Sequence, residues 1–397
     1  MRVLFTSLRN TSHFLPLVPF IEACVRRGHQ VAVAAPSDLA ERVTKTGVEF
    51  FPFDHPGDAG LRPFWARLPT ASPEEAKQIV IGGIFAGINA KMALPGLRKT
   101  VAAFGPSVIV RESQEYAAIV AAEEAHIPHA RVAITLHRPE EEIFAVAAAA
   151  VDLHREELGL PLDPGGEALL REPALTLMPA SLEYPEAAGT HVLRFRAMRR
   201  APAPLPDWWG GDARPLVYVT LGTVAGGMDN RQEAYRAVAE AVSALPARVL
   251  FTVGNEFSRE TLGEMPANVR VERFVPQDDV LPHAAAALCH GGSGSVLGAL
   301  AAGVPLVVTP LFADQPDNAA RVATTGAGLA VDGRALSVEE LRGALSRVMA
   351  EDTFRMVARR FAAEIAALPP TDEAALQIER IARAENGRSG GPLESRR

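Results

Sequence analysis

Residues 286–318, AALCHGGSGSVLGALAAGVPLVVTPLFADQPDN, carry the pattern that decides the fold. A short apolar run, 286–289, is followed by a glycine-rich turn, by a helical segment that ends near Gly303, and by a second apolar run, 305–309. This order is typical of a βαβ unit, whose two strands are parallel. Both runs are apolar throughout, which indicates strands that are buried on both faces.

The same alternation continues outward from this stretch. The second half contains a helical segment at 231–245 and further strand-like runs at 216–220, 249–253 and 269–273. The first half contains helical segments at 15–27, 116–125 and 140–157, a Pro- and Gly-rich loop at 56–73, and strand-like runs at 2–7, 30–35, 48–53 and 108–110. We therefore predict the α/β class, with two Rossmann-like, doubly wound domains that face each other across a cleft.

Length and composition place the domain boundaries. A chain of 397 residues suits two domains at roughly 150 residues each. Proline and glycine concentrate in RRAPAPLPDWWGGDARP, which is typical of a linker. We predict an N-terminal domain at 1–198, a linker at 199–215 and a C-terminal domain at 216–370. A last amphipathic helix, 371–385, is expected to pack back on the N-terminal domain, and the polar segment 386–397 to be disordered.

Charge and cysteine content exclude several classes of protein. The net charge of −7 argues against nucleic-acid binding, which needs clustered Lys and Arg. Two cysteines, Cys24 and Cys289, are too few for a disulfide scaffold. No uninterrupted apolar run approaches the ~20 residues of a membrane span, and the N-terminus lacks a signal-peptide pattern. We expect a cytoplasmic protein that binds small molecules, contacts no membrane and can form a homodimer.

The turn HGGSGS, residues 290–295, is the strongest local indication of function. Glycines let the backbone approach a ligand closely, and the amides at the start of a helix form an anion site. A phosphate or diphosphate is the expected ligand, and a tight turn without a ligand is the alternative. A second turn, Thr220-Leu221-Gly222-Thr223, follows strand 216–220 and offers hydroxyl and amide donors at the edge where open α/β sheets bind ligands. An ordinary connecting turn is equally compatible with it.

The glycine spacing leaves a second interpretation open. Gly292, Gly294 and Gly298 approximate a dinucleotide fingerprint, and Asp314 lies 20 residues after Gly294, where that fingerprint places an acid. This pattern would make the chain an NAD-dependent oxidoreductase. Alternatively, Asp314 and Gln315 offer the donors and acceptors that suit sugar hydroxyls, or Asp314 is a helix N-cap.

A histidine in the first half can supply acid–base chemistry. His13 follows the first strand, beyond the carboxyl end at which ligands bind. With an unperturbed pKa of about 6.5, a histidine acts as a general base near neutral pH. Glu112 follows strand 108–110 at the same edge of the sheet and can orient the imidazole. A surface loop histidine is the alternative. The sequence has no metal-ligand spacing, so we expect no bound metal.

In this order, the segments resemble the bacterial natural-product glycosyltransferases of the UDP-glycosyltransferase superfamily, which have the GT-B fold. The likeness is specific in residues 274–319, FVPQDDVLPHAAAALCHGGSGSVLGALAAGVPLVVTPLFADQPDNA, and weaker between residues 55 and 200. It is greatest to the actinobacterial enzymes that glycosylate polyketide, enediyne and macrolide aglycones.

The resemblance implies a role for each matching residue. His13 is similar to the catalytic base of the family and Glu112 to its acidic partner. The residues similar to those that grip the donor diphosphate are Thr223, His290, Gly291, Gly292, Ser293, Gly294 and Ser295. Those at the nucleobase positions are Phe274, Val275 and Gln277, and those at the sugar positions are Asp314 and Gln315. The variable first half implies an acceptor pocket of Phe64, Trp65, Ile84, Phe85, Ile88 and His137, which are equally compatible with core positions.

Two positions depart from the family pattern. Ser12 stands where glycine often precedes the histidine, and Phe274 stands where many relatives have a tryptophan that stacks on the base. By itself, an aromatic residue at the end of a strand is more often part of the core.

The activity implied by the resemblance is inverting transfer of a (deoxy)hexose from a dTDP- or UDP-sugar to a hydroxyl of an apolar aglycone, without a cofactor or a metal. Besides the oxidoreductase, two alternatives remain. A non-catalytic sugar-nucleotide-binding protein would keep the diphosphate grip while His13 stays idle. A GT-B sugar-nucleotide epimerase would turn over the donor with no acceptor present.

Overall fold

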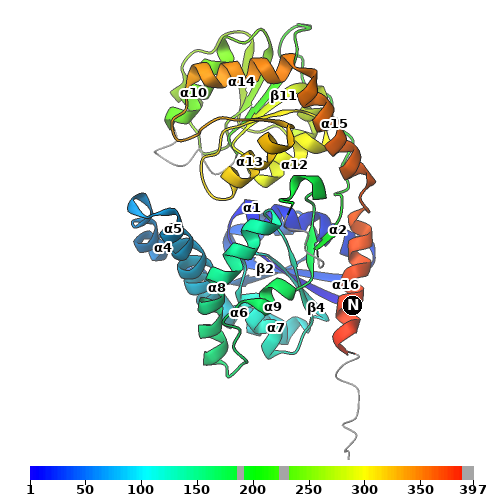
Figure 1. The fold of residues 1–397 in the computed structure, drawn as a ribbon. Helices are drawn as coiled ribbons and strands as arrows, with labels where there is room; N and C mark the ends of the chain where they lie inside the picture. The colour runs from blue at the N-terminus through cyan, green and yellow to red at the C-terminus, as the bar shows by residue number, and fades with distance from the viewer. Residues whose placement is uncertain (186–191, 223–231, 387–397) are drawn as a thin grey trace, which may run out of the picture. The chain divides into compact units, whose positions relative to one another are not determined.

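The structure, a computed structural model of the chain, describes all residues except 186–191, 223–231 and 387–397. The chain forms two compact units (Figure 1). The first unit comprises Met1–Leu177, Pro185–Met198 and Pro369–Arg397, and the second comprises Met178–Tyr184 and Arg199–Leu368. The predicted disordered tail lies outside the described residues, apart from its first residue, Asn386, which ends the last helix.

Two segments differ from the predicted boundaries. Met178–Tyr184, predicted within the N-terminal domain, belongs to the second unit, where Arg321 donates to the carbonyl of Leu182 (2.9 Å) and Tyr184 donates to Asp317 (2.9 Å). The predicted linker also belongs to the second unit, and the Asp279 carboxylate binds it through Arg200 (2.6 Å). Both assignments agree with polar contacts that the sequence pattern does not reveal.

The first unit contains a seven-stranded parallel sheet in the order β3-β2-β1-β4-β5-β6-β7. Its strands are β1 (Arg2–Thr6), β2 (Gln30–Pro36), β3 (Glu49–Phe53), β4 (Val108–Glu112), β5 (His129–Val132), β6 (Ala174–Thr176) and β7 (Val192–Arg194). The central strands are buried almost throughout, in line with their apolar sequences. The prediction of strands in this region is confirmed, with β5, β6 and β7 added.

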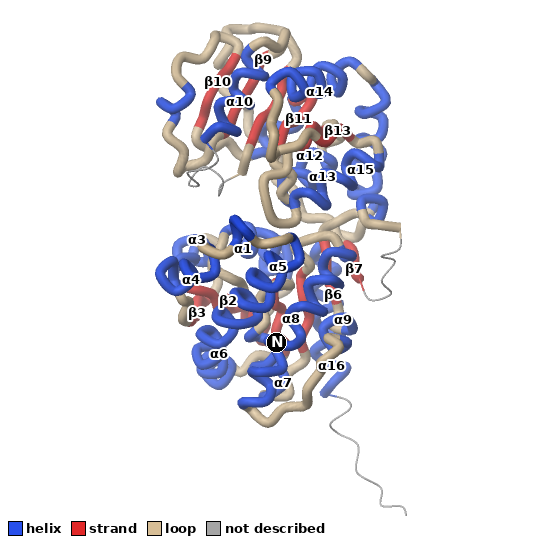
Figure 2. The backbone as a smooth tube through the Cα atoms, turned by 60° about the vertical axis from the view of Figure 1, so that its left-hand side comes forward, coloured by secondary structure: helices blue, strands red, loops and turns tan. Residues whose placement is uncertain are grey.

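Helices cover both faces of this sheet (Figure 2). One face packs against α1 (Thr11–Phe14), the 3₁₀ turn η1 (Leu15–Leu17), α2 (Val18–Arg26) and α16 (Thr371–Asn386). The other packs against the π-helix η4 (Gln78–Asn89), α6 (Ala90–Phe104), α7 (Ala117–Glu124), α8 (His137–Glu157) and α9 (Glu167–Arg171). The remaining helices of this unit are η2 (Ser37–Leu39), α3 (Ala40–Thr44), α4 (Gly57–Trp65), η3 (Leu68–Thr70) and α5 (Pro73–Lys77).

The predicted loop at 56–73 is wrong, because it contains α4 and η3. Pro63 lies inside α4, and Pro69 lies at the start of η3, where a proline is well tolerated. The following stretch, Pro73–Phe104, is the one helix among the described residues that is long and apolar enough to cross a membrane by length and composition. Part of its surface is buried, and η4 within it packs against α8.

The second unit contains a six-stranded parallel sheet in the order β10-β9-β8-β11-β12-β13. Its strands are β8 (Leu216–Thr220), β9 (Arg248–Thr252), β10 (Val269–Glu272), β11 (Ala284–Cys289), β12 (Leu306–Val308) and β13 (Gly328–Ala330). Its helices are η5 (Ala180–Leu182), α10 (Gln232–Ser243), η8 (Arg259–Leu262), α11 (Gln277–Val280), η9 (Leu281–His283), α12 (Ser293–Ala301), α13 (Gln315–Thr325), α14 (Val338–Ala350) and α15 (Asp352–Ala367). The predicted α/β class with two parallel sheets is confirmed.

Each sheet reverses its strand order once. The reversal lies between β1 and β4 in the first unit and between β8 and β11 in the second. Ligands of open α/β sheets bind beyond the carboxyl ends of the strands at such a point. His13 follows β1 and Glu112 ends β4, while the two candidate phosphate turns lie at the ends of β8 and β11. Candidate site residues therefore lie at the carboxyl edge of each sheet.

Candidate active site

His13 and Glu112 form a hydrogen-bonded pair in the first unit. His13 lies in α1, directly after β1, and its Nδ1 is 3.0 Å from Oε1 of Glu112, the last residue of β4. The other oxygen, Oε2, accepts a hydrogen bond from the backbone amide of Gln114 (2.7 Å). Both side chains are buried or nearly so. Because an ionised carboxylate only accepts, Nδ1 carries the hydrogen in this contact and Nε2 carries the lone pair.

The π-helix η4 places an aromatic ring against this pair. The rings of Phe85 and His13 form a T-shaped pair with a centroid distance of 5.6 Å and an interplanar angle of 82°. Wide π-helical turns are uncommon and often accompany functional sites. Glycines allow close packing here: a Cβ atom at Gly83 would lie 2.9 Å from the ring of Phe64. Phe64 therefore packs against η4, the helix that contains Phe85.

The other candidate acceptor residues are more scattered. Ile84 is fully buried, Ile88 is half-buried, and Trp65 is 42% exposed at the end of α4. His137 begins α8, and its Nε2 lies 3.2 Å from Glu141 Oε1. Ile84 is thus placed as a core residue, whereas Phe85 is the candidate in direct contact with His13.

In the second unit, the ring of His290 lies between two glycines. A Cβ atom added at Gly222 would lie 2.7 Å from Nε2 of His290, and one at Gly292 would lie 2.5 Å from it. Gly222 also has φ +84°, a conformation that side chains disfavour. Burial lowers the pKa of His290 to about 4, and hydrogen bonding to the backbone of Thr220 partly opposes this shift. The imidazole is therefore neutral at pH 7 and can donate a single N–H.

The helix α12 begins at the glycine-rich turn. Gly292 occupies the N-cap and has no side chain to bind the first amides of α12. Ser293 Oγ donates to Asp314 Oδ2 (2.9 Å), and Asn318 Nδ2 donates to the same oxygen (3.0 Å) and to the carbonyl of Gly291 (2.9 Å). Ser293, Asp314 and the turn thus form one cluster beside a helix N-terminus.

Asp314 is the N-cap residue of α13 by position, but its side chain does not cap the helix. The preceding residue, Ala313, has φ +56°, which is unusual for a residue other than glycine. Such backbone strain concentrates at ligand sites. The side chain of Gln315 has a structural contact instead, because its Oε1 accepts from the amides of Leu311 (2.8 Å) and Phe312 (3.0 Å).

The predicted nucleobase residues lie after β10. Gln277 Nε2 donates to the carbonyl of Gly294 (3.2 Å), which joins this segment to the start of α12. Phe274 is 66% exposed, and Val275 is half-buried. Gly294 and Ser295 belong to the first turn of α12, with no atom within 4 Å of a Cβ at Gly294. The prediction for Thr223 lies outside the described residues.

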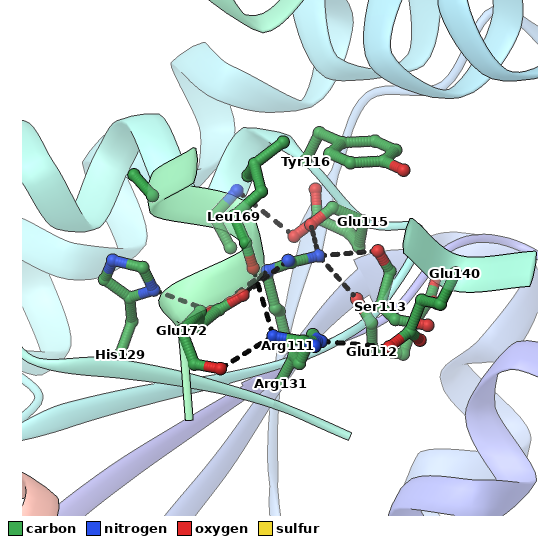
Figure 3. Close-up of polar contacts among 12 residues, drawn as sticks. Arg111, Glu112, Ser113, Glu115, Tyr116, His129, Arg131, Glu140, Leu169 and Glu172 are labelled. Atoms are coloured by element: carbon green, nitrogen blue, oxygen red, sulfur yellow. Dashed lines mark hydrogen bonds and ion pairs between the residues drawn. The ribbon is translucent and has the colours of Figure 1, made fainter. Parts of the chain in front are cut away.

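A buried charged network that the sequence pattern did not predict lies beside Glu112 (Figure 3). Arg111 pairs with Glu172 (2.5 Å), and Arg131 pairs with Glu140 (3.0 Å), with all four side chains fully buried. Despite desolvation, the pKa of Glu172 is lowered to about 2, mainly by the charge of Arg111. The signal in the sequence was an arginine among the apolar residues of two strands, VIVRE and HARV. A charge in such a strand requires a buried partner.

Among the described residues, no group of three or more His, Cys, Asp and Glu side chains could hold a metal ion.

Comparisons with known proteins assign the chain to a family. Residues 202–388 match the family model described as "UDP-glucoronosyl and UDP-glucosyl transferase". The chain is 31% identical to 4'-demethylrebeccamycin synthase of Lentzea aerocolonigenes, covering 95% of this chain and 99% of the relative. It is 32% identical to L-demethylnoviosyl transferase of Streptomyces niveus, covering 93% and 95%.

The chain belongs to the bacterial natural-product glycosyltransferases of the UDP-glycosyltransferase superfamily. This glycosyltransferase also matches a solved structure, glycosyltransferase VinC in complex with dTDP, with a TM-score of 0.77 and 26% identity, covering 97% of this chain and 100% of VinC. The predicted family and GT-B fold are confirmed. The glycosyltransferase attaches sugars to natural products, so the oxidoreductase interpretation of Gly292, Gly294 and Gly298 is set aside.

Proposed function

We propose that this glycosyltransferase moves a (deoxy)hexose from dTDP to a hydroxyl of an apolar aglycone with inversion, using His13 as the general base. The observation that carries the proposal is the 3.0 Å contact between His13 Nδ1 and Glu112 Oε1. A buried histidine that is oriented by a carboxylate beyond the end of a parallel strand is suited to remove a proton.

The reaction follows from the tautomer that Glu112 selects. Nε2 of His13 takes the proton of the acceptor hydroxyl as its oxygen attacks the anomeric carbon. A C–O bond forms on one face of the sugar, and the bond to the diphosphate breaks on the other. The electron pair of the broken bond stays on the departing phosphate oxygen, so the configuration inverts. Glu112 stabilises the imidazolium that forms.

The groups proposed to stabilise the diphosphate leaving group belong to the second unit. The uncapped amides of α12, with Gly291 and Ser295 in the same turn, meet the negative charge that develops on the diphosphate. His290 is a neutral imidazole, since burial lowers its pKa to about 4, and its ring packs between Gly222 and Gly292 and holds the turn in place. Donors fixed in this way need no metal, so the proposed reaction has neither metal nor cofactor.

Different observations support the proposed donor and the proposed acceptor. VinC is described as a complex with dTDP, which favours dTDP over UDP for this glycosyltransferase. Asp314, held by Ser293 and Asn318, is the proposed contact for the donor sugar. The exposed ring of Phe274 is the proposed stacking surface for the base. Phe85, at the His13 ring, is the proposed contact for an apolar acceptor.

Calorimetric titration with dTDP, UDP and NAD, without added metal, tests the donor site. The proposal predicts micromolar binding of dTDP that is lost in His290→Ala. His283→Ala is the matched control, because His283 is exposed at the opposite end of β11 and should leave binding unchanged. Binding of UDP alone would reassign the donor, and equal binding by the wild type and His290→Ala would contradict the assigned diphosphate site.

A transfer assay with a dTDP-hexose and a hydroxylated apolar acceptor tests the reaction. The product should carry the anomeric configuration opposite to that of the donor, as read by NMR. Retention of configuration would contradict the proposal. Turnover of the donor with no acceptor present would support the epimerase alternative.

A further inference from the structure

Arg111 and Glu112 are neighbours on β4 that point to opposite faces of the sheet. Successive side chains of a strand alternate between faces. Glu112 shares its face with Val110, in the core beside α2 and α16. Arg111 shares its face with Ile109, in the core beside α6 and α7. The ion pairs of Arg111 and Arg131 in Figure 3 therefore lie on the face of the sheet opposite to that of the Glu112 side chain.

Arg111 nevertheless contacts the backbone that carries the Glu112 side chain. Its Nη1 donates to the carbonyl of Ser113 at 2.7 Å and to the carbonyl of Glu112 at 3.3 Å. The same turn includes the Gln114 amide, which donates to Glu112 Oε2. The Arg111 guanidinium thus binds the turn at residues 112–114 from one face of the sheet. The Glu112 carboxylate projects from the same turn on the opposite face.

Arg111 is itself held in a single orientation. Its Nε and Nη2 donate to the carboxylate of Glu172 at 3.1 and 2.5 Å. His129 Nδ1 lies 2.7 Å from the same carboxylate. A planar guanidinium can bind a carboxylate through one edge and backbone carbonyls through another, whereas the ammonium of lysine is a point charge. Glu172 therefore fixes the direction from which Nη1 reaches the turn.

We propose that Arg111 is the positioning residue of the His13–Glu112 pair, setting the Glu112 carboxylate from the opposite face of the sheet. The inference rests on the proposed role of His13 as base. Without the Arg111 guanidinium, the turn at residues 112–114 can shift. The distance between the Glu112 carboxylate and His13 Nδ1 then increases. The imidazolium then loses stabilisation, and proton removal becomes less favourable.

Arg131 provides a matched control. It is the register partner of Arg111 on β5 and is equally buried. Its Nε donates to Glu140 (3.0 Å), and its Nη1 donates to the carbonyls of Leu169 (3.1 Å) and Glu172 (2.7 Å). Replacing it disturbs a buried ion pair of the same kind, but the group that binds the Glu112 turn is retained.

The test compares Arg111→Lys, Arg131→Lys and Glu112→Gln in the full chain. Arg111→Lys should lower kcat at least tenfold with the acceptor KM within about threefold, while Arg131→Lys should change kcat by less than threefold. The acid limb of the pH profile of kcat/KM should move to lower pH in Arg111→Lys and in Glu112→Gln but not in Arg131→Lys, because His13 loses its carboxylate partner in the first two variants. A merely structural role would reduce the amount of active enzyme without moving this limb.

The outcomes separate the two proposals. Equal effects of the two lysine variants, or an unmoved acid limb in Arg111→Lys, would overturn the role of Arg111. An unchanged kcat in Glu112→Gln would instead overturn the proposed base. If Arg111→Lys does not fold, the double variant Arg111→Met, Glu172→Met replaces the whole ion pair with apolar side chains, which buried sites often tolerate. It should fold and show the same loss of kcat, and full activity in this variant would contradict the inference.

Discussion

His13 Nδ1 and Glu112 Oε1 are 3.0 Å apart, although 99 positions separate these residues in the chain. The pair forms because β1 and β4 are parallel neighbours that end at the same edge of one sheet. Buried pairing of this kind fixes both the tautomer and the orientation of the imidazole. The fold thus places a candidate base and its partner where open α/β sheets bind ligands.

Glu112→Gln tests this partnership. The amide of glutamine can present an N–H to Nδ1, which would favour the wrong tautomer of His13. We expect kcat to fall by about 10²-fold with the affinity for dTDP unchanged, measured by steady-state kinetics and calorimetry. Glu41→Gln, on the exposed surface of α3, should leave both quantities unchanged. A kcat within threefold of the wild-type value would contradict the assignment.

Gly292→Ala tests the packing of His290. The added Cβ would lie 2.5 Å from Nε2 of His290, so the ring or the turn must move. We expect the dTDP dissociation constant to rise at least tenfold in a calorimetric titration. Gly343→Ala is the control, because this exposed position in α14 has no atom within 4 Å. It should leave binding unchanged and stabilise the protein by ~0.5–1 kcal/mol. Unaltered dTDP binding in Gly292→Ala would contradict the assignment of this turn.

Glu115 makes the stability of the first unit depend on pH. Burial raises the pKa of its carboxyl to about 7; Thr6, which donates to it (2.7 Å), opposes the shift, and the charge of Glu112 adds to it. Between the ordinary pKa of 4.5 and about 7, the folded state binds more protons than the unfolded state. The contribution of Glu115 to the free energy of unfolding therefore falls as pH rises through this window, by up to ~1.4 kcal/mol per pH unit.

Glu115→Gln removes this titration. The variant should gain stability relative to the wild type as pH rises from 4.5 to 7.5. Urea unfolding can be followed by Trp65 fluorescence in a background with Trp208→Phe and Trp209→Phe, because these three are the tryptophans of the chain and only Trp65 belongs to the first unit. A difference in unfolding free energy that is the same at both pH values would contradict the raised pKa.

Ile378→Ala tests the place of the last helix. Ile378 of α16 is fully buried in the core that also contains Phe20 and Ile21 of α2. Loss of a large buried side chain costs about 2–5 kcal/mol, so the first unit should unfold at clearly lower urea. Met356→Ala, at a 53% exposed position of α15, should change stability by less than ~0.5 kcal/mol. Equal effects of the two substitutions would contradict this packing.

The features that depend on local sequence pattern and on the order of segments along the chain could be predicted from the sequence. Apolar runs such as LVYVT and VLFTV predicted strands, because strands buried on both faces need apolar side chains at every position. The edge at which His13 and Glu112 lie followed from parallel strands alone. The resemblance in residues 274–319 then indicated the glycosyltransferase family, which the relatives confirm.

The features that depend on distant partners could not be predicted. Arg111 and Arg131 interrupt apolar strands, and only the folded structure shows that Glu172 and Glu140 neutralise them. The stretch 78–89, rich in glycine, gives a weak helical pattern, yet it forms a π-helix that packs against α8. Gln315 was predicted to contact the sugar, but its Oε1 accepts a hydrogen bond from the amide of Leu311 in the preceding loop. The spacing of residues in the sequence does not predict this contact.

The most direct test of the account is the turnover number of His13→Ala, measured with a dTDP-hexose and a hydroxylated apolar acceptor, alongside dTDP titration of the same sample. His126→Ala, which removes an exposed histidine of the first unit, is the control. If His13 is the general base, kcat should fall by about 10²–10⁴-fold while the dTDP dissociation constant stays within twofold of wild type. A His13→Ala enzyme that retains kcat within threefold would contradict the account.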